Sequence, residues 1–166
     1  MGTVIGIDIG GSITKIAAMS HGEVLGNLQV KATDPIASLY GALGKYMSTQ
    51  RLRLGDIEHI MVTGVGSASI SERIYDIPTS RVDEFYCIGR GGLFTTGLTQ
   101  GLIVSMGTGT AFVMAEPDSI RHIGGTGVGG GTLVGLSNAI LRVRDVNNLV
   151  QLAEQGDLGH VDLSIG

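Results

Sequence analysis

The sequence predicts an α/β fold in which a unit of three strands and a helix occurs twice. Residues 3–31 hold three short apolar runs separated by glycine, as in a meander of strands, and Asp34-Pro35 then opens a helix. From residue 101 the same order of strands and helix begins again. Because an internal repeat decides the fold, we expect two similar domains with a cleft between them. The predicted domains are residues 1–99 and 100–166.

Caps and apolar spacing define the elements of the first unit. Asp34 suits the N-cap and Pro35 the first helical position, where its missing N–H costs nothing. Apolar residues then recur every three or four positions as far as Met47, which predicts one buried helix face. We expect strands at 3–8, 13–19, 23–31, 58–63 and 79–83, a short helix at 67–75 capped by Ser67 or Ser69 and ended by Pro78, and a glycine-interrupted helix at 86–98.

The second unit is shorter than the first. It predicts strands at 102–106, 111–114 and 120–123, a helix that includes Leu133 to Leu141, and a last helix capped by Asp145. It has no counterpart of the β-α pairs that close the first unit, and residues 162–166 stand where these should begin. We therefore expect the chain to be a fragment, with an exposed strand edge in its second sheet.

Composition excludes several classes of protein. The formal net charge is −4, and the 11 lysines and arginines form no basic run, which argues against a nucleic-acid surface. No apolar run reaches about 18 residues and no charged segment precedes the first strand, so we expect neither a membrane span nor a signal peptide. The single cysteine, Cys87, excludes an internal disulfide and favours the reducing cytoplasm. The 28 glycines, more than twice the usual share of about 7%, fall in clusters that predict tight turns.

The turn between the first two strands has the residue types of a phosphate-binding hairpin. Glycine has no Cβ, so Gly10 and Gly11 can reach φ > 0 and approach a ligand closely, and successive N–H groups of such a turn can converge on a phosphate oxygen. Asp8 at the end of the first strand offers an oxygen ligand for Mg²⁺. An ordinary Gly-Gly turn remains the alternative. The candidate phosphate-binding residues are Gly10, Gly11, Ser12 and Ile13 through their N–H groups, Ser12 and Thr14 through their hydroxyls, and Lys15 through its charge.

Four segments carry a resemblance to a known family. The opening Ile5-Gly6-Ile7-Asp8 to Lys15 resembles the first phosphate motif of the actin-like ATPase superfamily, which includes sugar kinases and heat-shock chaperones. Together with segments 62–66, 105–110 and 124–133, it is more similar to the type II pantothenate kinases. The resemblance covers the whole chain, residues 152–157 and 161–163 included, and about the first three-fifths of a full-length member. It implies ribonuclease H-like domains built from βββαβα units, the second of them incomplete.

The family's activity is the ATP-dependent phosphorylation of the primary hydroxyl of pantothenate, the first step of coenzyme A synthesis. The resemblance therefore implies ATP, Mg²⁺, a pantothenate substrate and a cytoplasmic homodimer, with no nucleic acid and no membrane. Glu84 stands where the family has its catalytic glutamate, and a carboxylate at the end of the 79–83 strand could take the hydroxyl proton. Asp83 is the rival base, and strand alternation would point the two residues to opposite faces.

The resemblance also implies a nucleotide site in the second unit. Gly107, Thr108 and Gly109 match a second phosphate clamp, and the loop 130–134 opens a helix whose free N–H groups favour anions. Arginine usually stands where this chain has His122, with Arg121 one place earlier, so which of the two contacts the substrate stays open. The residues matched to the family's nucleotide loop are Gly130, Gly131, Thr132, Leu133 and Val134, and Val146 stands where some members place an aromatic residue beside the adenine.

Three other functions remain as alternatives. A sugar kinase of the same fold usually carries an aspartate base, and no sugar-kinase signature surrounds Glu84. An ATP-dependent activator of a dehydratase or radical system needs cysteines for a shared iron–sulfur cluster, and only Cys87 is present. A truncated chain could also be a non-catalytic domain that binds partners. Binding of ATP and Mg²⁺ would separate a working site from an inert domain.

Overall fold

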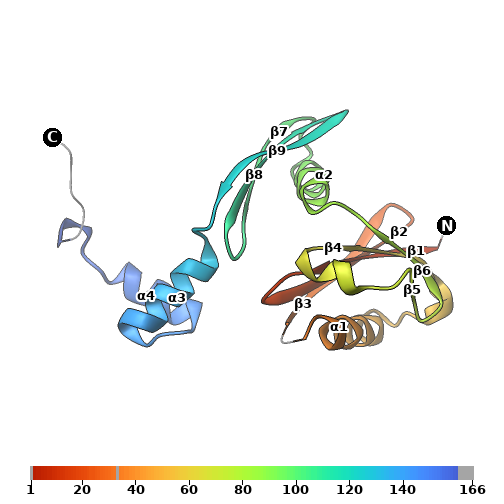
Figure 1. Ribbon diagram of the computed structural model, residues 1–166, viewed down its shortest axis with the longest axis horizontal. Coiled ribbons are helices and arrows are strands. Elements are labelled where there is room, and N and C mark those ends of the chain that lie inside the picture. The colour runs from red at the N-terminus through yellow and green to blue at the C-terminus, as the bar shows by residue number, and fades with distance from the viewer. Residues whose placement is uncertain (1, 33, 161–166) are drawn as a thin grey trace. The chain divides into compact units, whose positions relative to one another are not determined.

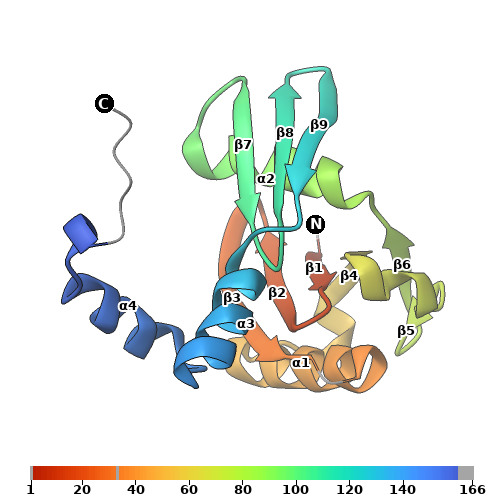
Figure 2. The ribbon, with the colours of Figure 1, turned by 60° about the vertical axis from the view of Figure 1, so that its left-hand side comes forward.

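The computed structural model describes residues 2–32 and 34–160, and the larger of its two sheets contains both antiparallel and parallel strands (Figures 1 and 2). The strand order is β3-β2-β1-β4-β6-β5. The first three strands form an antiparallel meander, whereas β4 lies parallel to β1 and β6 lies parallel to β4. These strands are β1 (Thr3–Ile9), β2 (Ile13–Ser20), β3 (Glu23–Lys31), β4 (Ile57–Thr63), β5 (Arg73–Ile74) and β6 (Ile77–Arg81).

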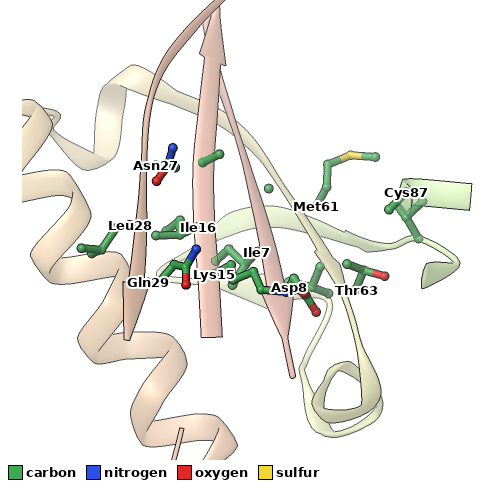
Figure 3. Close-up of a pocket in the computed structure, with 14 residues that line it drawn as sticks. Ile7, Asp8, Lys15, Ile16, Asn27, Leu28, Gln29, Met61, Thr63 and Cys87 are labelled. Atoms are coloured by element: carbon green, nitrogen blue, oxygen red, sulfur yellow. Dashed lines mark hydrogen bonds and ion pairs between the residues drawn. The ribbon is translucent and has the colours of Figure 1, made fainter. Parts of the chain in front are cut away.

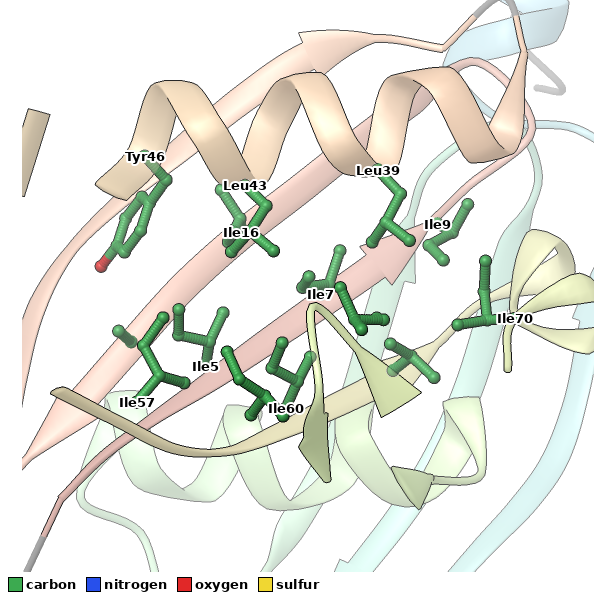
Figure 4. Close-up of a cluster of buried hydrophobic side chains, with 14 residues drawn as sticks. Ile5, Ile7, Ile9, Ile16, Leu39, Leu43, Tyr46, Ile57, Ile60 and Ile70 are labelled. Atoms are coloured by element: carbon green, nitrogen blue, oxygen red, sulfur yellow. The ribbon is translucent and has the colours of Figure 1, made fainter. Parts of the chain in front are cut away.

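Helix α1 (Pro35–Gln50) covers one face of this sheet and encloses its core (Figure 4). Its N-terminus is capped as predicted, because the Asp34 carboxylate accepts a hydrogen bond of 2.7 Å from the Ala37 N–H. Alternation along β1 points every second side chain toward the helix, and each fully buried isoleucine or leucine contributes about 1.5–3 kcal/mol. The core residues that line this face are Ile5, Ile7, Ile9, Ile16, Leu39, Leu43, Tyr46, Ile60 and Val62.

The prediction of a helix at 67–75 is wrong. Residues Val65–Ser69 form a short 3₁₀ turn, η2, and β5 then pairs with β6 in a tight hairpin. Pro78 is therefore not a helix breaker but lies inside β6. The two residues of the turn, Tyr75 and Asp76, both have positive φ, 50° and 63°. Neither residue is glycine, so the sequence lacks the glycine that usually indicates a two-residue hairpin turn.

The second sheet is a three-stranded meander, β7-β8-β9, as the repeat predicted. Helix α2 (Glu84–Thr96) packs on it through glycine, because a Cβ at Gly89 would lie 2.6 Å from Ile120 and one at Gly92 would lie 2.7 Å from Ile103. These glycines let the helix and the strands approach closely. The elements that follow α2 are β7 (Gly101–Met106), β8 (Thr110–Glu116), β9 (Ser119–Thr126), α3 (Gly130–Leu141) and α4 (Val146–Glu154), and two further 3₁₀ turns are η1 (Leu54–Asp56) and η3 (Leu158–His160).

The chain divides into two compact units that do not separate at a single point. Residues 1–103 and 113–123 form unit 1, and residues 104–112 and 124–166 form unit 2. The domain boundary at residues 99/100 stays a prediction, and the elements expected to begin at 162–166 lie outside the described residues. Within the described ranges, no helix is both long and apolar enough to cross a membrane.

Candidate functional site

The β1–β2 hairpin of unit 1 places two of the predicted site residues directly opposite each other. Asp8 pairs with Lys15 in the strand register, and Lys15 Nζ lies 3.0 Å from Asp8 Oδ2 in an ion pair. Gly10 is needed for the turn, because its N–H donates to the Ile13 carbonyl and a Cβ would lie 2.7 Å from that oxygen. The hairpin thus holds one carboxylate and one ammonium together at its base.

Two details of the hairpin differ from expectation. Neither Gly10 nor Gly11 has a positive φ, so a close contact and not a left-handed backbone requires glycine here. Thr14 has no exposed surface and lies on the α1 side of the sheet, whereas Asp8 and Lys15 lie on the other side. The Thr14 hydroxyl, which has no hydrogen-bond partner, therefore does not join the hairpin's other polar groups.

Residues at the end of β4 complete the surroundings of Asp8. Because β4 is parallel to β1, Thr63 lies beside Asp8 in the register and Gly64 follows at the same edge of the sheet. Gly64 has φ 85° and ψ 169°, and a Cβ there would lie 2.5 Å from Asp8 Oδ1 and 2.7 Å from the Ile9 carbonyl oxygen. Only glycine therefore leaves room for the Asp8 carboxylate in its observed position.

Asp83 and Glu84 lie at the start of α2 and not at the end of a strand, because β6 ends at Arg81. Asp83 is the N-cap, and its carboxylate accepts a hydrogen bond of 2.8 Å from the Tyr86 N–H. Glu84 is the first helical residue. The two carboxylates thus differ because Asp83 caps the helix and Glu84 begins it. The prediction that strand alternation points them to opposite faces is wrong.

Electrostatics connect Glu84 to the hairpin. Burial raises the pKa of the Glu84 carboxyl, the negative charge of Asp8 raises it further, and the positive charge of Lys15 opposes this. A carboxylate is influenced in this way only by charges in its vicinity. Glu84 therefore lies within electrostatic range of the Asp8–Lys15 ion pair, and we call these three residues the charged cluster of unit 1.

A cavity of about 300 Å³ lies beside this cluster, on the face of the sheet away from α1 (Figure 3). Asp8, Lys15 and Thr63 line one part of it, and Cys87 of α2 lines it as well. Burial raises the pKa of the Cys87 thiol above its ordinary value, a hydrogen bond with the Thr63 side chain opposes this, and three nearby carboxylates raise the pKa further, so the thiol stays protonated at neutral pH. The sequence analysis did not place Thr63 and Cys87 in the site. The pairing of β4 with β1, which would have indicated Thr63, is a tertiary feature.

The structure separates Arg121 from His122. Arg121 lies 3.6 Å from Glu116 in an ion pair. The His122 ring stacks on the ring of Phe85, with centroids 3.9 Å apart and planes inclined by 9°. Phe85 directly follows Glu84, so His122 and not Arg121 contacts the start of α2.

In unit 2, the second predicted phosphate hairpin is joined to the start of α3. The Gly130 N–H donates to the Gly107 carbonyl at 2.8 Å, and the Gly131 N–H donates to the Thr108 carbonyl at 3.2 Å. These two N–H groups are therefore not free, contrary to the expectation from the helix start. A Cβ at Gly129 would lie 2.7 Å from the Gly109 carbonyl, so the hairpin and the helix are in backbone contact.

The remaining predicted residues of unit 2 continue from this contact. Thr132 accepts a hydrogen bond from the Gly129 N–H and donates one to the Gly127 carbonyl, which fixes the loop. Leu133 and Val134 follow in the first turns of α3, and Val146 begins α4 with its side chain half exposed. Their contact with a nucleotide stays a prediction.

The carboxylate of Asp8 is of the ligand type that Mg²⁺ takes. Among the described residues, no group of three or more His, Cys, Asp or Glu side chains could hold a metal ion. Mg²⁺ is commonly held by one or two carboxylates together with water and phosphate oxygens. The single partly exposed carboxylate of Asp8 matches that pattern.

Comparison with known proteins relates this geometry to a family. The Fumble family matches residues 98–166. A type II pantothenate kinase of Oceanobacillus iheyensis is 30% identical over 171 residues, a region that includes 97% of this chain and 58% of that protein. Another of Staphylococcus aureus is 27% identical over 166 residues, with the same coverage. The chain thus spans less than two thirds of the length of these relatives.

A solved structure has the same fold. The activator of the 2-hydroxyisocaproyl-CoA dehydratase from Clostridium difficile, with bound ADPNP, superposes with a TM-score of 0.76 over 93% of this chain and 57% of that one, at 19% identity. At this identity the likeness shows the fold, whose two βββα meanders are those described above. The chain therefore has an actin-like ATPase fold, and its sequence is similar to type II pantothenate kinases over 58% of their length.

Proposed function

We propose that the protein transfers the γ-phosphoryl group of ATP to the primary hydroxyl of pantothenate, the first step of coenzyme A synthesis. The observation that carries the proposal is the cluster of Glu84, Asp8 and Lys15 beside a cavity in unit 1. It combines a candidate base, a candidate metal ligand and a candidate phosphate-binding cation. Similarity to pantothenate kinases over 97% of the chain supports this substrate. A cytoplasmic homodimer is part of the proposal.

Each member of the cluster has a chemical role in this reaction. Glu84 would accept the proton of the attacking hydroxyl, and its raised pKa brings it closer to neutral pH, where a general base works best. Lys15 and the N–H groups of the hairpin would bind the phosphates. Asp8 would hold Mg²⁺, which supplies charge stabilisation on the phosphoryl oxygens when it is bound. Positioning and charge stabilisation contribute most of the rate in phosphoryl transfer.

Unit 2 would supply the rest of the nucleotide site. The Gly107-Thr108-Gly109 hairpin and the start of α3 form one hydrogen-bonded body, which would contact the nucleotide. The binding of both hairpins to one polyphosphate belongs to the proposal.

An ATP-dependent activator is the second candidate, because such a protein shares the fold. An iron–sulfur cluster shared by two subunits needs cysteine ligands from each. Cys87 is the only cysteine in the sequence, and its thiol stays protonated beside three carboxylates. This environment disfavours metal ligation by Cys87, so the observations favour the kinase.

Two conservative variants test the proposal. In Glu84→Gln we expect turnover to fall by about 10²–10⁴-fold, while calorimetric binding of ATP and Mg²⁺ stays within a few-fold of the parent. Asp83→Asn is the matched control, since asparagine also caps helices and keeps the hydrogen bond to Tyr86. Transfer of labelled phosphate to pantothenate, with glucose as the competing acceptor, measures the activity. Parent-like turnover in Glu84→Gln, or its loss in Asp83→Asn alone, would assign the base elsewhere.

A further inference from the structure

A second cavity in unit 1, of about 590 Å³, shares no lining residue with the Asp8 site. Its lining residues come from β4, β5, β6 and the segment before β5, and Figure 2 shows β5 and β6 at its right. Its volume is in the range of small-molecule sites. We call it the β6 groove and define it by His59, Ser71, Glu72, Arg73, Thr79 and Arg81.

Two arginines give the β6 groove a positive charge in an otherwise acidic chain. Arg81 extends from the end of β6 to the opposite wall, where its guanidinium donates to the Ile70 carbonyl at 2.6 Å. Arg73 is held on the Asp76 side, where it hydrogen-bonds the Asp76 carbonyl and lies 3.7 Å from the carboxylate. A guanidinium has five N–H donors, so each arginine keeps donors that these contacts do not use.

Backbone donors lie on the same side. The Thr79 N–H points away from β4 and donates to the Glu72 carbonyl at 2.9 Å. Since N–H groups two residues apart point to the same edge of a strand, the Arg81 N–H points toward the β6 groove as well. Ser71 and Thr79 also line the groove, but the Ser71 hydroxyl donates to the Arg73 carbonyl and the Thr79 hydroxyl donates to the Ile77 carbonyl, so the proposal does not count on these two hydroxyls.

The hairpin that carries Arg73 has an unusual backbone. Tyr75 and Asp76 both have positive φ, and the Tyr75 ring is held edge-on against Tyr40 with centroids 5.1 Å apart. Two consecutive non-glycine residues in this conformation persist only where their surroundings fix them, and such residues cluster at ligand-binding sites. The turn thereby fixes the strand that carries Arg73, which lines the β6 groove together with Arg81.

We propose that the β6 groove binds a small doubly charged oxyanion, either inorganic phosphate or a phosphate monoester. Arginine forks bind phosphate through paired hydrogen bonds, and the lining of the β6 groove includes two arginines. The three terminal oxygens of a phosphate monoester can accept hydrogen bonds from more of these donors than the two oxygens of a carboxylate can. Glu72 is the only carboxylate in the lining, and it opposes binding. The proposal does not depend on the kinase activity.

The experiment titrates the chain with inorganic phosphate at constant ionic strength and follows amide NMR shifts and calorimetric heat. All variants also carry Lys15→Gln, which removes the positive charge proposed to bind phosphate at the β1–β2 hairpin. We expect Arg81→Gln and Arg73→Gln each to weaken binding on the order of tenfold, and Glu72→Gln to strengthen it. Arg90→Gln, outside the groove, should leave it unchanged. Glycerol phosphate in place of phosphate distinguishes a monoester site, which binds it more tightly, from a free-phosphate site.

Three results would overturn the proposal. The first is a Lys15→Gln chain that does not respond to phosphate. The second is an equal loss in Arg90→Gln and Arg81→Gln, which would mean diffuse attraction to surface charge. The third is an unchanged affinity in Arg73→Gln and Arg81→Gln when circular dichroism shows both variants folded. The gain expected for Glu72→Gln keeps the test valid even if one arginine variant fails to fold.

Discussion

Replacement of Gly64 by alanine tests the geometry around Asp8 most directly. The new Cβ would lie 2.5 Å from Asp8 Oδ1 and 2.7 Å from the Ile9 carbonyl oxygen. The backbone at φ 85° and ψ 169° is also one that side-chain-bearing residues avoid. We therefore expect Gly64→Ala to lower the free energy of unfolding of unit 1 and to displace the Asp8 carboxylate.

The size of the effect follows from two contributions. Backbone strain at such a position costs about 1–3 kcal/mol, and overpacking against the Ile9 backbone, which cannot rotate away as the Asp8 side chain can, costs about 1–3 kcal/mol more. The sum, about 2–6 kcal/mol, is a large part of the 5–15 kcal/mol that is typical of a domain. Displacement of Asp8 should in addition weaken Mg²⁺-dependent nucleotide binding.

Urea unfolding followed by tyrosine fluorescence measures this, since all four tyrosines belong to unit 1. Gly44→Ala in α1 is the control, because no atom lies within 4 Å of its Cβ position and the change should stabilise the helix by about 0.4–1 kcal/mol. A Gly64→Ala chain within about 0.5 kcal/mol of the parent would refute the close contact with Asp8.

Three further predictions concern charge and the second hairpin. Asp8→Asn should lower the pKa of Glu84, because it removes a neighbouring negative charge; a ¹³C NMR titration that shows no downward shift would contradict their proximity. Because the pKa of Glu84 is raised in the folded state, ionisation of this carboxyl destabilises the folded parent as pH rises from the ordinary carboxyl pKa through the raised one. Glu84→Gln has no such charge, so in urea unfolding its stability relative to the parent should be unchanged below the ordinary carboxyl pKa and should grow above that pKa. Gly129→Ala should separate α3 from the 107–109 hairpin and speed amide exchange at Gly130 and Gly131, whereas Gly127→Ala, which meets no atom within 4 Å, should not.

Local patterns predicted much of the fold. The cap of α1 at Asp34 and the strand expected at 3–8 depend on neighbours in the sequence, and both are confirmed. The hairpin at Tyr75 and Asp76 was missed because its turn has no glycine and its strands are short, so the segment was interpreted as a helix. Here a tertiary contact with Tyr40 outweighs the local preference.

The candidate site was predictable residue by residue but not as an arrangement. The motif around Asp8 and Lys15 identified the ion pair's members, yet their contact follows only from the hairpin register. The burial of Thr14 and the donation of the Gly130 N–H to Gly107 depend on which groups fold against each other. That the β1–β2 hairpin and the 107–109 hairpin face each other across a cleft stays a prediction.

The ion pair between Asp8 and Lys15 has a consequence for selectivity. A cation that binds alone must separate the Asp8 carboxylate from Lys15 and leave the ammonium unpaired, whereas an anion that binds alone must leave the carboxylate unpaired. A metal–phosphate complex replaces the Asp8–Lys15 ion pair by two new pairs, because its metal ion meets the Asp8 carboxylate while its phosphate meets the Lys15 ammonium. The hairpin is therefore suited to recognise the two ions only in combination, and free salt should compete with that complex poorly.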